Sequence, residues 1–145
     1  MESTFRMANA MNESPRSSAE LLSDEECLAL LECHSLGRIG LSINALPAIL
    51  PVIYRVIDGA IVVDGWGSTR IGDALLQSVV AFEVDEVRDE KGCGWSVLVI
   101  GVASPFSEDI ELSSTTGDFN PHGSFVIRPD IISGRRVLLG ETLSS

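Results

Sequence analysis

The residues best suited to chemistry lie in one short loop, Asp64-Gly65-Trp66-Gly67-Ser68-Thr69-Arg70. Its glycines would let the backbone approach a ligand closely. Ser68 and Thr69 offer hydroxyls, and a helix starting after them would offer free N–H groups. Arg70 offers a positively charged guanidinium with a forked set of N–H donors. Together these groups could hold a phosphate. The alternative interpretation is an ordinary loop followed by a capped helix.

A second candidate is the apolar segment that contains Trp95 and Ser96. Trp95 could stack on a planar ligand or fill a subunit interface, and the alternative is simple core packing. The same choice applies to Tyr54 and Trp66. The acidic run Glu83-Val84-Asp85-Glu86 favours a solvated strand edge over a site.

The sequence assigns no side chain as a catalytic acid, base or nucleophile. It contains no GxSxG, HExxH or Walker-type motif, and its two histidines, His34 and His122, stand alone. The spacing of Cys27, Cys33 and Cys93 matches no zinc pattern, so we expect no metal site and reduced thiols in a cytoplasmic protein. Difficult chemistry would therefore need a cofactor.

Composition limits the class of protein and of ligand. A chain of 145 residues fits one domain, and its net charge of -11 argues against nucleic acid and against an anionic membrane surface. A small anionic ligand stays possible, because a site responds to its local field. The longest apolar candidate for a membrane span, residues 45–53, is short and is interrupted by Pro47 and Pro51. We predict a flexible polar tail over residues 1–20 and a single domain over residues 21–145.

The domain begins with a helix signal and continues with strands. Ser23 and Glu26 form a capping-box pattern, and Gly37 is a plausible end of that helix. Alternating apolar residues and the Asp58-Gly59 hairpin signal then predict strands. Strands are expected at 38–43, 46–57, 60–63, 79–87, 94–103, 125–128 and 135–139, with a short helix at 70–77 and a turn at 129–134.

These elements predict a mainly β fold with small helices. The two prolines near the start of the second strand indicate an edge or a bulge. Six or seven short antiparallel strands close most easily into a barrel, because closure removes exposed strand edges.

The order of the segments resembles a known family. The chain reads SDEECLALL, GRIGLS, LPAILPVIY, a DG hairpin, STRIGDALL, VAFEVDE, GWSVLVIG and IRPDIISGRR. This series resembles the pyridoxamine 5′-phosphate oxidase-like family of FMN-binding split β-barrels, in the branch related to nitroimidazole-resistance proteins. The resemblance covers residues 22–139, and VAFEVDE with GWSVLVIG is its most specific portion.

The resemblance implies an antiparallel split β-barrel that forms a homodimer and binds FMN in a groove between the subunits. It implies a flavin-dependent oxidoreductase that acts on a small-molecule substrate. The family has a Thr-Lys pair where this chain has Thr69-Arg70, so Arg70 would hold the phosphate with help from Ser68 and Thr69.

The resemblance also implies positions for the flavin ring. Pro51, Val52 and Tyr54 would lie along the ring, and Trp95 and Ser96 would come from the strand near the dimer groove.

Two departures from the family pattern leave other ligands open. This chain has Ile53 where the family commonly has Asn, and Asp64 where it commonly has a basic residue. A carboxylate beside a phosphate would repel it. The alternatives are a deazaflavin coenzyme, heme with His34 or His122 as axial ligand, or a non-catalytic dimer that binds another ligand or none.

Overall fold

The computed structural model describes residues 2–11, 19–66, 69–87, 93–106 and 123–138. Its helices are α1 (Glu2–Met11), α2 (Asp24–Glu32) and α3 (Arg70–Leu75). Its strands are β1 (Ala19–Leu22), β2 (Leu36–Ile43), β3 (Leu46–Ile57), β4 (Ala60–Val63), β5 (Val79–Val87), β6 (Cys93–Pro105) and β7 (Phe125–Leu138). None of the helices in these described ranges is long and apolar enough to cross a bilayer.

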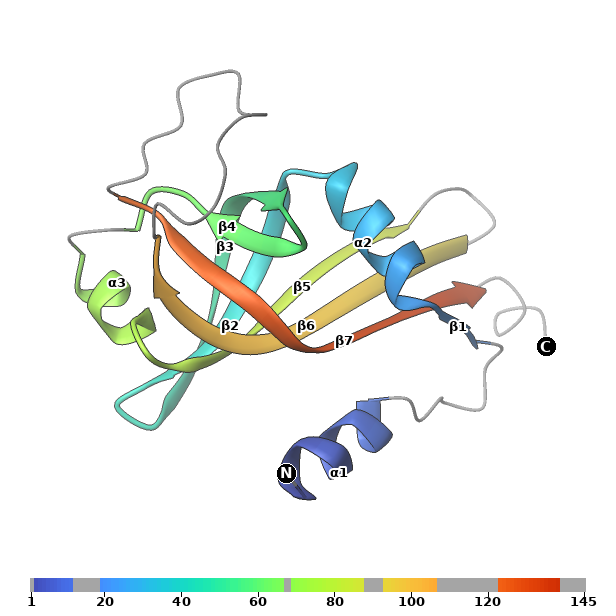
Figure 1. Cartoon of the computed structure of the whole chain (residues 1–145), viewed down its shortest axis with the longest axis horizontal. Helices are drawn as coiled ribbons and strands as arrows, with labels where there is room; N and C mark the ends of the chain where they lie inside the picture. Colours follow the sequence, from blue (N-terminus) through green and yellow to red (C-terminus); the bar gives the residue numbers. More distant parts are fainter. Residues whose placement is uncertain (1, 12–18, 67–68, 88–92, 107–122, 139–145) are drawn as a thin grey trace.

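The strands form a closed antiparallel barrel, as the sequence predicts (Figure 1). The strand order is β1-β7-β4-β3-β2-β5-β6, and an additional pairing between β7 and β6 closes the ring. β1 pairs only with the far half of β7 and therefore extends the sheet outside the ring. The expected fold class, mainly β with small helices, is confirmed.

Helix α2 covers one end of the barrel and α3 lies at the other (Figure 1). The predicted capping box is present, since the Ser23 side chain accepts from the Glu26 N–H and the Glu26 carboxylate accepts from the Ser23 N–H. Cys27 and Leu31 on α2 are fully buried against the barrel. Burial raises the pKa of the Cys27 thiol to about 11, which agrees with an inert, reduced cysteine.

The sequence places the end of α2 too late. The helix ends at Glu32, and Gly37 lies inside β2 instead of stopping the helix. A Cβ on Gly37 would sit 2.6 Å from Cε2 of Phe82 on β5, so the glycine is needed for close packing of the aromatic ring. A glycine that admits a neighbouring ring and one that ends a helix look alike in sequence.

The expected turn at 129–134 is also wrong. β7 runs unbroken from Phe125 to Leu138 and pairs with β6 along its length. The register shifts between Ile100 and Gly101, which pair with Ile131 and Pro129, so Asp130 has no partner across the ladder. This bulge accommodates Pro129, which has no N–H to give to the ladder.

The amino-terminal region contains more structure than the expected tail over residues 1–20. Glu2–Met11 form α1, and β1 begins at Ala19 and pairs with β7, so the expected boundary at residue 21 cuts through a strand. Leu22 of β1 is buried in the core, which explains why the chain orders before the capped helix.

Two hairpin turns and the proline-rich strand follow the predictions. Asn44, Ala45, Asp58 and Gly59 all have positive φ and link β2 to β3 and β3 to β4. Pro47 and Pro51 lie in the half of β3 that pairs with β2 alone, where one edge needs no N–H donor.

Candidate functional site

Over residues 51–54 the two faces of β3 differ sharply in exposure. Val52 and Tyr54 point into the barrel and are buried, whereas Pro51 and Ile53 point outward and are exposed. The Tyr54 hydroxyl donates to the Leu31 carbonyl at 2.7 Å, and its ring packs edge-on against Phe82 at 4.9 Å. Burial raises the pKa of Tyr54 to about 12.

The predicted ring-binding set stays a prediction, and its members divide between the two faces of the strand. The side chains of Val52 and Tyr54 serve the core, so a ligand outside the barrel could meet only their backbone. Pro51 and Ile53 are the residues on this strand that present side chains to such a ligand.

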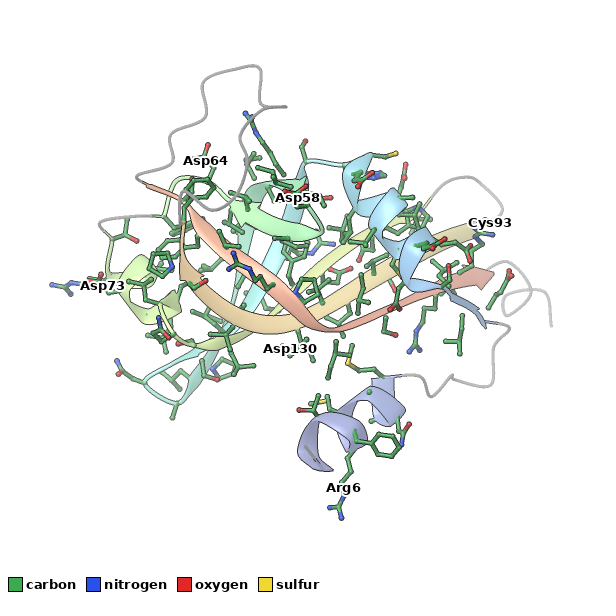
Figure 2. All side chains as sticks on the ribbon, in the orientation of Figure 1. Arg6, Asp58, Asp64, Asp73, Cys93 and Asp130 are labelled. Carbon is green, nitrogen blue, oxygen red and sulfur yellow. The ribbon has the colours of Figure 1, made fainter. Side chains whose placement is uncertain are left out.

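The loop after β4 begins beside Ile53 of β3, in line with the β3–β4 ladder. The Asp64 N–H donates to the Ile53 carbonyl at 3.1 Å, and the Gly65 N–H donates to the Gly123 carbonyl at 3.2 Å. Figure 2 shows Asp64 at the start of this loop, at the same end of the barrel as α3. Asp64 is half-buried, and its carboxylate would repel an anion bound beside it.

Thr69 is the N-cap of α3. Its Oγ1 accepts from the Gly72 N–H at 2.8 Å and donates to the Trp66 carbonyl at 2.8 Å. A Cβ on Gly72 would lie 2.0 Å from the Trp66 oxygen, so the loop and the helix are in direct contact. The Thr69 hydroxyl proton is therefore already donated to the Trp66 carbonyl. The other candidate, Ser68, lies outside the described residues.

Arg70 is the first residue of α3, and it is exposed. Arg55 is a second cation in this region that sequence reasoning missed. It occupies the next outward position of β3 after Ile53 and is half-buried. The alternation Pro51, Ile53, Arg55 was the available signal, but β3 is apolar on both faces, so the sequence does not tell which set faces out.

Trp95 and Ser96 do not join this loop within one chain. Trp95 is buried near the start of β6 and contacts the His34 ring edge-on at 4.9 Å. Figure 2 shows the neighbouring Cys93 at the opposite end of the long axis from Asp73 on α3. Core packing, one of the two interpretations, is what Trp95 does here, while Ser96 is half-buried on the outward face.

His34 is held on both ring nitrogens. Its Nδ1 lies 2.9 Å from the Leu30 carbonyl oxygen, and its Nε2 lies 3.0 Å from Oε2 of Glu86 on β5. The ring therefore ties the end of α2 to the sheet, and neither nitrogen is available to a metal unless one of these contacts breaks.

A charged cluster on the outward face replaces the solvated edge that the acidic run suggests. Arg38 on β2 donates from Nε to Glu83 at 3.2 Å and from Nη2 to Asp85 at 2.8 Å. Arg38 is also the cross-strand neighbour of Pro51, so the cluster borders the exposed part of β3. Spacing along the sequence gave no signal, because the partners are 45 and 47 residues apart.

The pKa values of the two carboxyl groups in this cluster are shifted in opposite directions. Burial, followed by the hydrogen bond and the charge of Asp85, raises the pKa of Glu83 to about 7, although Arg38 opposes the shift. The hydrogen bond with Glu83, followed by the bond and charge of Arg38, lowers the pKa of Asp85. The pair therefore holds one proton on Glu83 below neutral pH.

Next to the charged cluster lies an apolar row across four strand pairs. Ile49, Gly40, Ala81, Ile100 and Ile131 are consecutive register partners on β3, β2, β5, β6 and β7. Ile49 at its edge is 73% exposed. We call this set of residues the apolar row. It gives the outward face a hydrophobic patch of the kind that contacts another molecule.

A closed antiparallel barrel with helices at its ends and an exposed sheet face defines a split β-barrel protein. Residues 23–136 match the family model described as pyridoxamine 5′-phosphate oxidase, and the chain belongs to this family. The predicted family is thus confirmed.

Individual relatives support the same assignment. An uncharacterised protein, Rv0080, of Mycobacterium tuberculosis is 30% identical over 86% of this chain and 91% of its own length. The FAD-binding protein of Mycobacterium smegmatis is 29% identical, with a TM-score of 0.65 over 82% of this chain and 98% of that chain. A pyridoxamine 5′-phosphate oxidase candidate from Corynebacterium glutamicum is 28% identical, with a TM-score of 0.66 over 88% and 98% of the two chains.

The branch named in the predicted family also has a structural counterpart. A 5-nitroimidazole antibiotic resistance protein candidate from Bacteroides thetaiotaomicron has a TM-score of 0.62 over 82% of this chain and 87% of that chain. At 12% identity this likeness shows the shared fold alone.

Proposed function

We propose that this protein is a flavin-binding oxidoreductase that holds the flavin on the outward face of β3, beside the loop after β4. The observation that carries the proposal is the hydrogen bond from the Asp64 N–H to the Ile53 carbonyl. It places the start of the loop that leads to Arg70 next to Ile53, whose side chain is exposed on the outward face of β3. Family membership supports the choice of a flavin over other planar anions.

The residues present fit a flavin in two respects. Pro51 and Ile53 offer a flat apolar surface for a ring, and a guanidinium is suited to a phosphate. Arg70 would hold the phosphate, and Arg55, the next outward residue of β3 after Ile53, is a second candidate cation. Asp64 is the opposing feature, so its carboxylate must stay hydrated or turn away when the anion binds. The bound flavin would supply the electron transfer.

We propose a homodimer as the working form. Trp95 and Ser96 lie far from the loop within one chain, so Ser96 could reach a flavin at Arg70 only across an interface with a second copy. The apolar row and the exposed Ile53 supply the apolar surface that such an interface needs.

FMN is the form of flavin that we propose. The Mycobacterium smegmatis relative binds FAD, so FAD is the natural competitor for the same surface. A deazaflavin coenzyme ranks below both, because its acidic tail needs more cations and Arg38 is already paired with two carboxylates. Heme on His34 ranks lowest, because both ring nitrogens are engaged. His122, the other candidate axial ligand, lies outside the described residues.

The test begins with the visible spectrum of freshly purified protein, followed by titration of the apoprotein with FMN, FAD and the deazaflavin coenzyme. We expect flavin absorption bands, and release of FMN on denaturation. Arg70→Gln should weaken FMN binding about tenfold or more, while Asp73→Asn, on the same helix, should not. Colourless protein that takes up no flavin would exclude the proposal, and a Soret band after heme addition would favour the heme alternative.

Activity is tested separately from binding. The bound flavin is reduced with dithionite, and its reoxidation by small oxidised molecules is followed by stopped flow. Reoxidation by such an acceptor at a rate above that of free FMN supports an oxidoreductase. A bound flavin that no acceptor reoxidises faster than free FMN would favour a non-catalytic ligand-binding dimer.

A further inference from the structure

Helix α1 lies across the outward face of the sheet, beneath β6 and β7 in Figure 1. Three hollows are formed jointly by α1 and the sheet. Phe5 lines one of about 610 Å³ with residues of β7, and Met7 lines one of about 370 Å³ that includes Gly40, Ala81 and Ile100 of the apolar row. Met11 lines a third, of about 420 Å³, with residues of β5, β6 and β7. The helix therefore covers the surface that the dimer would use.

The carboxyl end of α1 is anchored by β7. The Met11 carbonyl accepts from the Arg135 guanidinium and, at 3.4 Å, from the Ser133 hydroxyl. The last carbonyls of a helix have no partner within the helix, and a cation at that end is favoured by the helix dipole. Arg135 therefore supplies from the sheet the positive charge that α1 lacks in its own last turn.

The rest of α1 is held lightly. Phe5 remains 70% exposed and Met7 remains 48% exposed, although both line hollows against the sheet. A helix of 10 residues is marginal on its own in water, so its attachment depends on the Arg135 anchor and a few apolar contacts. We therefore expect another molecule that binds the same face of the sheet to be able to displace α1.

We propose that α1 is a detachable strap that competes with a second copy of this chain for the outward face of β2, β5, β6 and β7. The inference rests on the proposed homodimer. A stable interface needs about 800 Å² from each partner, and α1 occupies part of the apolar row, which spans four strand pairs of the sheet. Self-association would therefore require α1 to leave this face.

Docking of α1 is tested first, without reference to any dimer. Trypsin cleavage after Arg6, followed by mass spectrometry on dilute full-length protein, reports how often α1 detaches, because a docked helix is a poor substrate. Arg135→Gln should speed this cleavage about tenfold. The matched control is Arg136→Gln, since Arg136, the next residue of β7, pairs with Glu26 on α2 at 3.9 Å. Equal cleavage rates in all three proteins would overturn the strap.

Competition is tested by self-association of full-length variants, measured by sedimentation and light scattering. Met7→Glu places a carboxylate in the hollow under α1 and should tighten the dimer about tenfold. Asn9→Glu is the control, because Asn9 is exposed and lines none of these hollows. An unchanged or weaker dimer in Met7→Glu would overturn the competition.

The two proposals fail in different ways. If neither the wild type nor Met7→Glu associates up to millimolar concentration, the homodimer is wrong and the competition falls with it. The cleavage experiment then still decides whether α1 docks on the sheet, because it needs neither dimer nor flavin.

Discussion

The inward and outward faces of β3 have different roles, although their residues alternate along one strand. On the inward face, Val52 and Tyr54 are buried, and the Tyr54 hydroxyl donates a hydrogen bond to the Leu31 carbonyl. Outward, Pro51 and Ile53 are exposed beside the Asp64 loop. The inner face therefore stabilises the barrel and the outer face is available for binding, so substitutions on the two faces should separate stability from ligand affinity.

The largest effect is expected at the centre of the inner face. Phe82 is fully buried, packs against Tyr54 and fills the space left by Gly37. Phe82→Ala should lower the free energy of unfolding by about 3–5 kcal/mol, because it leaves a cavity. Denaturant unfolding measures this. Val79→Ala on the same strand, where Val79 is 66% exposed, should change it by less than about 0.5 kcal/mol.

The outer face should show a pH dependence that the inner face lacks. The pKa of Glu83 is raised from 4.5 to about 7 in the folded protein, so the folded state binds a proton more tightly than the unfolded state. The resulting stabilisation is full below about pH 4.5 and is lost as pH rises through about 7. Asp85, whose pKa is lowered, is ionised in both states over this window and adds no slope.

Glu83→Gln should remove this dependence. Between pH 4.5 and 7 the wild type should lose stability relative to the variant, by on the order of 1–2 kcal/mol once water access to the group is allowed for. Denaturant unfolding at a series of pH values measures the difference. Parallel curves for the two proteins across this window would show that Glu83 does not hold the proton.

A smaller effect is expected from Tyr54→Phe, which removes only the hydroxyl that bonds to Leu31. The free energy of unfolding should fall by about 1 kcal/mol, since the Leu31 carbonyl still accepts from the His34 N–H at 3.3 Å. FMN affinity, measured by fluorescence titration, should not change. A clear loss of affinity at unchanged stability would mean that Tyr54 reaches the ligand after all.

The smallest change in stability is expected at Ile53, the outward residue next to Tyr54. Ile53 is 54% exposed, so Ile53→Ser should alter the free energy of unfolding by less than about 0.5 kcal/mol. FMN affinity should nevertheless fall about tenfold, because the ring loses an apolar contact. Leu21→Ser, at a residue 49% exposed on β1, is the control. Equal affinities in both variants would remove β3 from the site.

The local signals of the sequence predicted most of the fold. The Ser23 capping box, the Asp58-Gly59 turn and the bounds of β5 follow from short-range chemistry, and all three are present. Pro129 misled because a bulge absorbs it, and Gly37 misled because its smallness serves Phe82. Both depend on a partner strand that is distant in sequence.

The site was harder to predict than the fold. Thr69 and Arg70 were placed correctly at the start of α3. Which alternate residues of β3 face outward could not be told, because Leu46–Ile57 is apolar on both faces. The Arg38–Glu83–Asp85 cluster and the Arg135 anchor of α1 require the register of the sheet, which no local spacing encodes.

The pairing of β7 with both β6 and β4 has a consequence for how the chain is made. β7 is the last strand of the described residues and pairs with both β4 and β6, so a growing chain on the ribosome holds open edges on β4 and β6 until residue 138 emerges. Open edges recruit other strands, and late, distant pairings slow folding. Synthesis of this barrel should therefore be most vulnerable to aggregation just before its final strand appears.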